Sequence, residues 1–126
     1  MKTRVLVVDD ERSLLLAVSG YLADRGYDVD CAIELEEAQA LLANDVFDVV
    51  ITDLRLSPLQ QTGGLTIISF IRERSLRSRV IVLTAYATPE AEREAELLGV
   101  DLFLHKPAAL SELARAIDSF KGTACQ

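Results

Sequence analysis

The chain has 126 residues, half of them hydrophobic, and a formal net charge of −7 at pH 7. This length suits one domain with a substantial buried core, and the excess of acidic residues argues against direct binding of nucleic acid. No apolar stretch is long enough for a membrane span, and the N-terminal residues do not form a basic and then apolar signal region. We therefore expect a cytoplasmic protein without membrane contact.

Apolar runs of strand length alternate with stretches of helical periodicity along the chain. We predict strands at residues 4–9, 28–33, 48–53, 79–84 and 101–105. We predict helices at residues 11–25, 35–44, 65–74, 89–98 and 110–121. The first, third and fourth strands are nearly continuous runs of Val, Ile and Leu, which is typical of parallel strands with helices on both faces. The pattern predicts an α/β fold with a doubly wound, five-stranded parallel sheet.

Local signals mark several helix ends in this pattern. Gly26 and Gly99 stand where a helix would end in a left-handed residue. Thr88 followed by Pro89 provides an N-cap and a first-turn proline. These signals agree with the helix boundaries that the apolar periodicity predicts.

Acidic residues end the first and third predicted strands. Asp9 and Asp10 follow one apolar run and Asp53 follows the other. Ligands of open α/β sheets bind outside the carboxyl ends of the strands, so we expect these carboxylates to gather there. Their mutual repulsion is costly unless a cation or a shared proton compensates it, and oxygen ligands suit Mg²⁺. The acids therefore predict a magnesium site that handles phosphate.

Four motifs at strand ends occur in a characteristic order: VLVVDDE at 5–11, ITDLRL at 51–56, VLTA at 82–85 and LHKP at 104–107. With these motifs the chain closely resembles the receiver domain of two-component response regulators. The resemblance covers essentially the whole chain and implies the flavodoxin-like strand order 2-1-3-4-5, with five helices. We assign residues 1–121 to this receiver and treat 122–126 as a loose tail, from which a linker to an output domain would begin.

The resemblance implies that Asp53 is the nucleophile of a phosphoryl transfer. Its carboxylate is expected to accept the phosphoryl group from a sensor histidine kinase or a histidine phosphotransfer protein, as an aspartyl phosphate. Asp10, with Asp9, is expected to hold Mg²⁺ beside Asp53, and the backbone carbonyl of Arg55 is expected to complete the ligand set. We therefore expect a signalling domain that catalyses only its own phosphorylation and dephosphorylation, and not an enzyme with an external substrate.

The resemblance also implies the parts of a switch. Lys106 is the cation that neutralises the transferred group, and Pro107 is expected to be cis. Thr84 offers a hydroxyl to a phosphoryl oxygen, and Phe103 matches the aromatic residue that turns inward in response. The readout is expected on the surface formed by the fourth helix, fifth strand and fifth helix, toward an output domain or a second copy of the chain.

The helix predicted at 11–25 carries more apolar residues than one inward stripe needs. On the helix predicted at 11–25, the residues Leu14, Val18 and Tyr21 fit the inward stripe. Three further leucines then remain as apolar surface, which the resemblance suggests as a docking face for the kinase or phosphotransfer partner: Leu15, Leu16 and Leu22.

The segment after Asp53 departs from the usual receiver. The loop into the third helix is longer than typical, with its glycines at positions 63 and 64. Arg55 and Tyr86 stand two positions beyond Asp53 and Thr84. Our hypothesis is that their bulk and the guanidinium of Arg55 slow hydrolysis of the aspartyl phosphate.

Other readings of the same residues stay open at this stage. The chain could be a phosphatase or phosphotransferase with a transient aspartate nucleophile, although the sequence has no insertion that would form a substrate pocket. It could also be a degenerate receiver that binds partners without phosphate. Asp9 and Asp10 could serve as acids at the start of the first helix.

Overall fold

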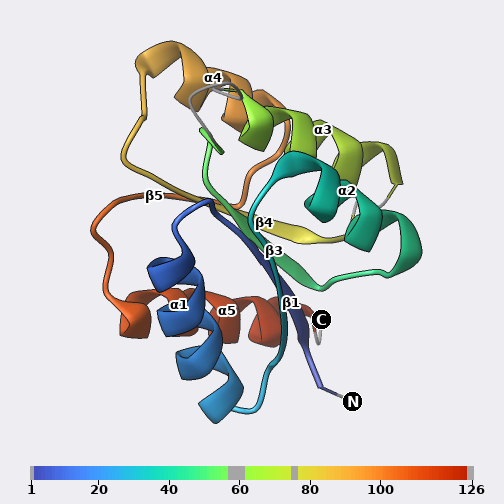
Figure 1. The fold of residues 1–126 in the computed structure, drawn as a ribbon, viewed down its shortest axis with the longest axis vertical. Coiled ribbons are helices and arrows are strands. Elements are labelled where there is room, and N and C mark those ends of the chain that lie inside the picture. Colours follow the sequence, from blue (N-terminus) through green and yellow to red (C-terminus); the bar gives the residue numbers. More distant parts are fainter. Residues whose placement is uncertain (1, 57–61, 75–76, 125–126) are drawn as a thin grey trace.

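The structure is a computed structural model that describes residues 2–56, 62–74 and 77–124. Strands and helices alternate along this part of the chain (Figure 1). The strands are β1 (Arg4–Val8), β2 (Asp28–Ala32), β3 (Val49–Thr52), β4 (Arg79–Thr84) and β5 (Leu102–His105). The helices are α1 (Arg12–Asp24), α2 (Leu35–Asn44), α3 (Gly63–Arg74), α4 (Pro89–Leu97) and α5 (Leu110–Ala124).

The five strands form one parallel sheet in the order β2-β1-β3-β4-β5, which confirms the predicted fold. The register aligns the carboxyl ends of the central strands. Val8 pairs with Thr52, and Thr52 pairs with Val82. The residues that follow these strands therefore emerge at one edge of the sheet.

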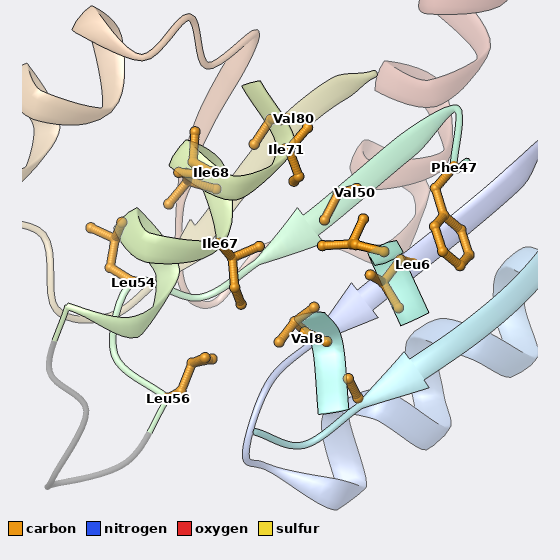
Figure 2. Close-up of a cluster of buried hydrophobic side chains, with 14 residues drawn as sticks. Leu6, Val8, Phe47, Val50, Leu54, Leu56, Ile67, Ile68, Ile71 and Val80 are labelled. Carbon is orange, nitrogen blue, oxygen red and sulfur yellow. The ribbon is translucent and has the colours of Figure 1, made fainter. Parts of the chain in front are cut away.

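Helices cover both faces of the sheet. Figure 1 shows α1 and α5 on one face and α2, α3 and α4 on the other. Side chains alternate along β1 accordingly, so that Val5 and Val7 pack toward α1 and α5 while Leu6 and Val8 pack toward α2 and α3. Figure 2 shows the hydrophobic core on the face of the sheet that α2 and α3 cover. Val50 belongs to this core together with Ile67, Ile68 and Ile71 of α3, and Phe47 lies at one end of it.

The local signals at helix ends are confirmed. Gly26 and Gly99 have φ of 94° and 79°, the left-handed conformation expected after a helix. The Thr88 side chain accepts a hydrogen bond from the Ala91 amide at 3.1 Å, and Pro89 is the first residue of α4. Most boundaries differ from the predicted ones by one or two residues, and the largest difference is at α5, which continues to Ala124 and takes in residues that we expected to be a tail.

The predicted inward stripe of α1 is confirmed at Val18 and wrong at Leu14 and Tyr21. Leu15, Val18 and Leu22 are the buried residues, while Leu14 and Tyr21 are only partly buried. Both sets repeat with helical spacing, so periodicity could not separate them. Of the three leucines that we expected on the surface, only Leu16 is exposed, at 77% of its area.

Two further observations bear on the sequence expectations. Residues 57–61 of the lengthened loop lie outside the described residues, so the loop's effect stays a prediction. None of the helices in the described ranges combines the length and apolar character that a membrane span requires.

Candidate functional site

The backbone at the carboxyl edge of the sheet fixes three of the predicted site residues. The hydrogen-bond ladder continues one residue beyond the strands, since the Asp9 amide donates to Ala32 O and the Asp53 amide donates to Val8 O, each at 3.1 Å. The Lys106 amide donates to Thr84 O at 2.9 Å. These bonds hold the three residues at one edge of the sheet, with Asp9 and Asp53 after the neighbouring strands β1 and β3 and Lys106 one strand further away, after β5.

The side chain of Lys106 joins the acids of the site. Its Nζ donates to Asp9 Oδ2 at 2.7 Å and to Asp53 Oδ2 at 2.9 Å. A third carboxylate, Glu11 Oε1, accepts from the same Nζ at 3.0 Å. Asp9 and Asp53 are each only 2% exposed, so the ammonium group compensates two charges that water cannot reach.

The electrostatics of the site follow from burial and from these contacts. Burial raises the pKa of Asp9, and the hydrogen bonds from Lys106 and from the Glu11 amide oppose this rise without cancelling it. Burial also works against the charge on Lys106, but its hydrogen bonds to Asp9, Asp53 and Glu11 prevail and raise the pKa of the amine above its ordinary value. Lys106 is therefore held as a cation.

Asp10 lies beside this cluster in the sequence but is exposed. Among the described residues, no three acids are arranged as a ready metal cluster. The donor set nevertheless fits a hard divalent cation, because the carboxylates of Asp9, Asp10 and Asp53 supply oxygen ligands and outnumber the single ammonium of Lys106. At the start of α1, Asp9 Oδ1 accepts from the Glu11 amide at 2.9 Å, so one acid also serves the beginning of the helix.

Thr84 and Phe103, the two residues predicted to form a switch, lie on the paired strands β4 and β5. Thr84 is fully buried at the end of β4, and its Oγ1 accepts from the Tyr86 amide at 3.1 Å. Phe103 of β5 is partly buried against the core under α2 and α3. Its ring centroid is 5.5 Å from that of His105, which is exposed. The peptide bond between Lys106 and Pro107 is cis, as expected.

Arg55 lies next to Asp53. Its amide donates to Asp53 Oδ1 at 3.3 Å. Its guanidinium carbon lies 4.3 Å from the centroid of the Tyr86 ring, so the two side chains stack at the rim of the site. The role of the Arg55 carbonyl as a metal ligand stays a prediction.

Two residues of the site escaped the sequence analysis. Glu11 contacts Lys106, although its position directly after the acidic pair was a signal of its place near the strand end. Gly64, the second residue of α3, lies against the backbone of Asp53, where an added Cβ would lie 2.1 Å from the Asp53 carbonyl oxygen. The Gly63-Gly64 pair was the available signal, since adjacent glycines at a helix start permit a close backbone approach.

Comparison with known proteins identifies the family to which this arrangement belongs. The family model described as "Response regulator receiver domain" matches residues 5–118. The chain belongs to the response regulator receiver family. A receiver is the signal-accepting domain of a two-component system, so the expected family and fold are both confirmed.

Individual relatives agree with this assignment. This receiver is 32% identical to the transcriptional regulatory protein DltR of Streptococcus agalactiae over 114 residues, which are 90% of this chain and 50% of DltR. It therefore spans about half the length of that relative.

Solved structures give the same picture. A CheY-like receiver domain protein from Methanospirillum hungatei matches with a TM-score of 0.87 at 25% identity, over 94% of this chain and 93% of that one. A response regulator from Burkholderia pseudomallei, solved with a phosphorylated aspartic acid, a calcium ion and citrate, matches with a TM-score of 0.82 at 29% identity. That match covers 90% of this chain and 65% of the other.

Proposed function

We propose that this receiver accepts a phosphoryl group on Asp53 from a phosphohistidine of a sensor histidine kinase or a phosphotransfer protein. A carboxylate oxygen of Asp53 attacks phosphorus, the phosphorus–nitrogen bond breaks, and the imidazole of the donor leaves. The observation that carries the proposal is the 2.9 Å contact between Asp53 Oδ2 and Lys106 Nζ at the carboxyl edge of the sheet. A fixed cation beside the nucleophile stabilises the charge that phosphoryl transfer develops.

We further propose that the reaction depends on Mg²⁺. The carboxylates of Asp9, Asp10 and Asp53 and the carbonyl of Arg55 would hold the ion, which supplies charge neutralisation to the transferring oxygens. The acidic surplus at the site supports this assignment. So does the Burkholderia pseudomallei regulator, whose structure combines a phosphorylated aspartic acid with a calcium ion.

The phosphoryl group on Asp53 would act as the signal of a switch. Thr84 would donate its hydroxyl hydrogen to a phosphoryl oxygen, and Phe103 would respond by packing more deeply beside β4. The changed surface would be that of α4, β5 and α5, contacted by an output domain or by a second copy of the chain. A transcriptional regulatory relative twice as long is consistent with an output domain after the receiver.

The face of α1 is the proposed docking site for the phosphoryl donor. The structure leaves Leu16 as its exposed leucine, with Leu14 partly buried beside it. This apolar surface is smaller than the sequence suggested, because Leu15 and Leu22 are used in the core.

The test of the proposed function is incubation with acetyl phosphate and Mg²⁺, followed by mass measurement of the intact chain. We expect one phosphoryl adduct per chain, complete loss of the adduct in Asp53→Asn, and retention in Asp24→Asn, which changes an exposed carboxylate at the end of α1. Removal of Mg²⁺ with a chelator should abolish the adduct. Many turnovers of donor per chain would favour a phosphatase or phosphotransferase, and the lack of any adduct would favour a phosphate-independent binding module.

A further inference from the structure

All three hydrogens of the Lys106 ammonium are engaged in this structure. An ammonium group has three N–H donors. They point to three different carboxylates, those of Asp9 and Asp53 at the floor of the site and that of Glu11 at its rim. If a phosphoryl oxygen is to accept a hydrogen bond from Lys106, one of these three carboxylates has to lose its own hydrogen bond from the ammonium group.

The three carboxylates differ in what such a loss would cost. The side chains of Asp9 and Asp53 are 3% and 2% exposed, whereas the side chain of Glu11 is 59% exposed. A buried carboxylate that loses the hydrogen bond from Lys106 cannot replace it with one from water, which is unfavourable. Glu11 can exchange Lys106 for water at little cost, because exposed ion pairs contribute little free energy. Glu11 is therefore the partner that leaves most readily.

We infer that Glu11 is the exchangeable third partner of Lys106, and that it yields its place to a phosphoryl oxygen when Asp53 is phosphorylated. This inference rests on the proposed function. Glu11 does not contact the reacting atoms in this role. It is a positioning residue that acts through Lys106.

The exchange has a consequence for the rate of phosphorylation. While Glu11 holds Lys106, it occupies the donor that the incoming phosphoryl group needs, and its negative charge repels that group. Removing the charge should therefore accelerate the reaction. Because Glu11 is largely exposed, the effect should be modest, about three- to fivefold at low ionic strength, and salt should screen it.

The experiment measures the rate of adduct formation on Asp53 from acetyl phosphate and Mg²⁺ over a range of ionic strength, with the whole chain. We expect Glu11→Gln to react about three- to fivefold faster than the wild type at low salt, and the two rates to converge as salt rises. The matched control is Glu96→Gln, which makes the same charge change on the exposed surface of α4 and should react at the wild-type rate. Thermal unfolding should be equal for all three proteins.

A second variant separates the contact with Lys106 from a simple effect of charge. Glu11→Asp keeps the charge but is one methylene shorter, so it should lose the 3.0 Å contact and react at a rate between those of the wild type and Glu11→Gln. A rate equal to the wild type for Glu11→Asp contradicts the exchange of partners. So does a rate for Glu11→Gln that is unchanged, lower, or matched by Glu96→Gln.

The proposed function can fail separately from this inference. If the wild type forms no Mg²⁺-dependent adduct on Asp53, the phosphoacceptor function and the exchange fall together. If the wild type forms the adduct and the Glu11 variants behave as it does, only the exchange is overturned.

Discussion

At the scale of single residues, Arg55 and Tyr86 are the side chains that distinguish the rim of this site. The guanidinium of Arg55 stacks 4.3 Å from the Tyr86 ring, and Tyr86 is 51% exposed. The Arg55 amide donates to Asp53 Oδ1. This arrangement supports the hypothesis that the pair slows the entry of the water that would hydrolyse a phosphoryl group on Asp53.

We predict that Arg55→Asn and Tyr86→Ala each shorten the half-life of the aspartyl phosphate, by about two- to fivefold. The estimate follows from the free energy of a partly exposed cation–π pair, and Arg55→Asn also removes a guanidinium that could hold a phosphoryl oxygen. The measurement is the decay of the adduct after removal of the donor. Unchanged or longer half-lives in both variants would contradict the hypothesis that this pair slows hydrolysis.

At the scale of elements, the start of α3 is pressed against the end of β3. The Gly64 amide donates to Leu54 O at 2.9 Å. A Cβ at this position would meet backbone atoms of Asp53 and Leu54, which cannot move aside as a flexible side chain could. The position of Asp53 is thus coupled to the packing of the next helix.

We predict that Gly64→Ala lowers the free energy of unfolding by about 1–3 kcal/mol, as overpacking typically does, and also slows adduct formation on Asp53. Gly20→Ala is the matched control, because Gly20 lies in α1 with no atom within 4 Å of an added Cβ. It should raise stability by about 0.5–1 kcal/mol, the usual gain of alanine over glycine in a helix. Urea denaturation measures both. Equal stabilities for the two variants would contradict the close approach at Gly64.

At the scale of the whole molecule, a polar cluster fastens α5 to the turn between α1 and β2. The Tyr27 hydroxyl donates to Asp118 Oδ1 of α5, and Arg25 Nη2 donates to the other oxygen of the same carboxylate at 2.8 Å. Burial, followed by the hydrogen bond to Asp118, raises the pKa of Tyr27 from 10.0 to about 12. A hydrogen bond from the neutral form of Tyr27 therefore links α5 to the turn between α1 and β2.

This pKa predicts a dependence of stability on pH. The folded chain holds the Tyr27 proton more tightly than the unfolded chain does, so the contribution is complete below pH 10 and is lost as pH rises toward about 12. We expect the urea midpoint of the wild type to fall over this interval, and Tyr27→Phe to start lower at neutral pH and to fall less. Tyr86→Phe, which alters an exposed ring, should retain the wild-type decline. A decline in Tyr27→Phe as steep as in the wild type would rule out this source.

Much of the molecule could be predicted from the sequence because the relevant signals are local. The apolar runs at residues 5–8 and 49–52 identify buried parallel strands, and the cap at Thr88 and the turn at Gly99 depend on neighbours within a few positions. The same locality explains the errors. Helical spacing fits both Leu14 and Leu15, and only the packing of α1 on the sheet selects Leu15 as the buried one.

The sequence by itself determined that acids and a lysine follow the ends of predicted strands, because short patterns of apolar residues indicate where each strand begins and ends. Only the tertiary structure decided how they meet. Lys106 is 97 positions from Asp9 and 53 from Asp53, and no local pattern specifies that one ammonium bridges both carboxylates and a third from Glu11. The strand register and the packing of both helical layers bring these distant groups within hydrogen-bond distance.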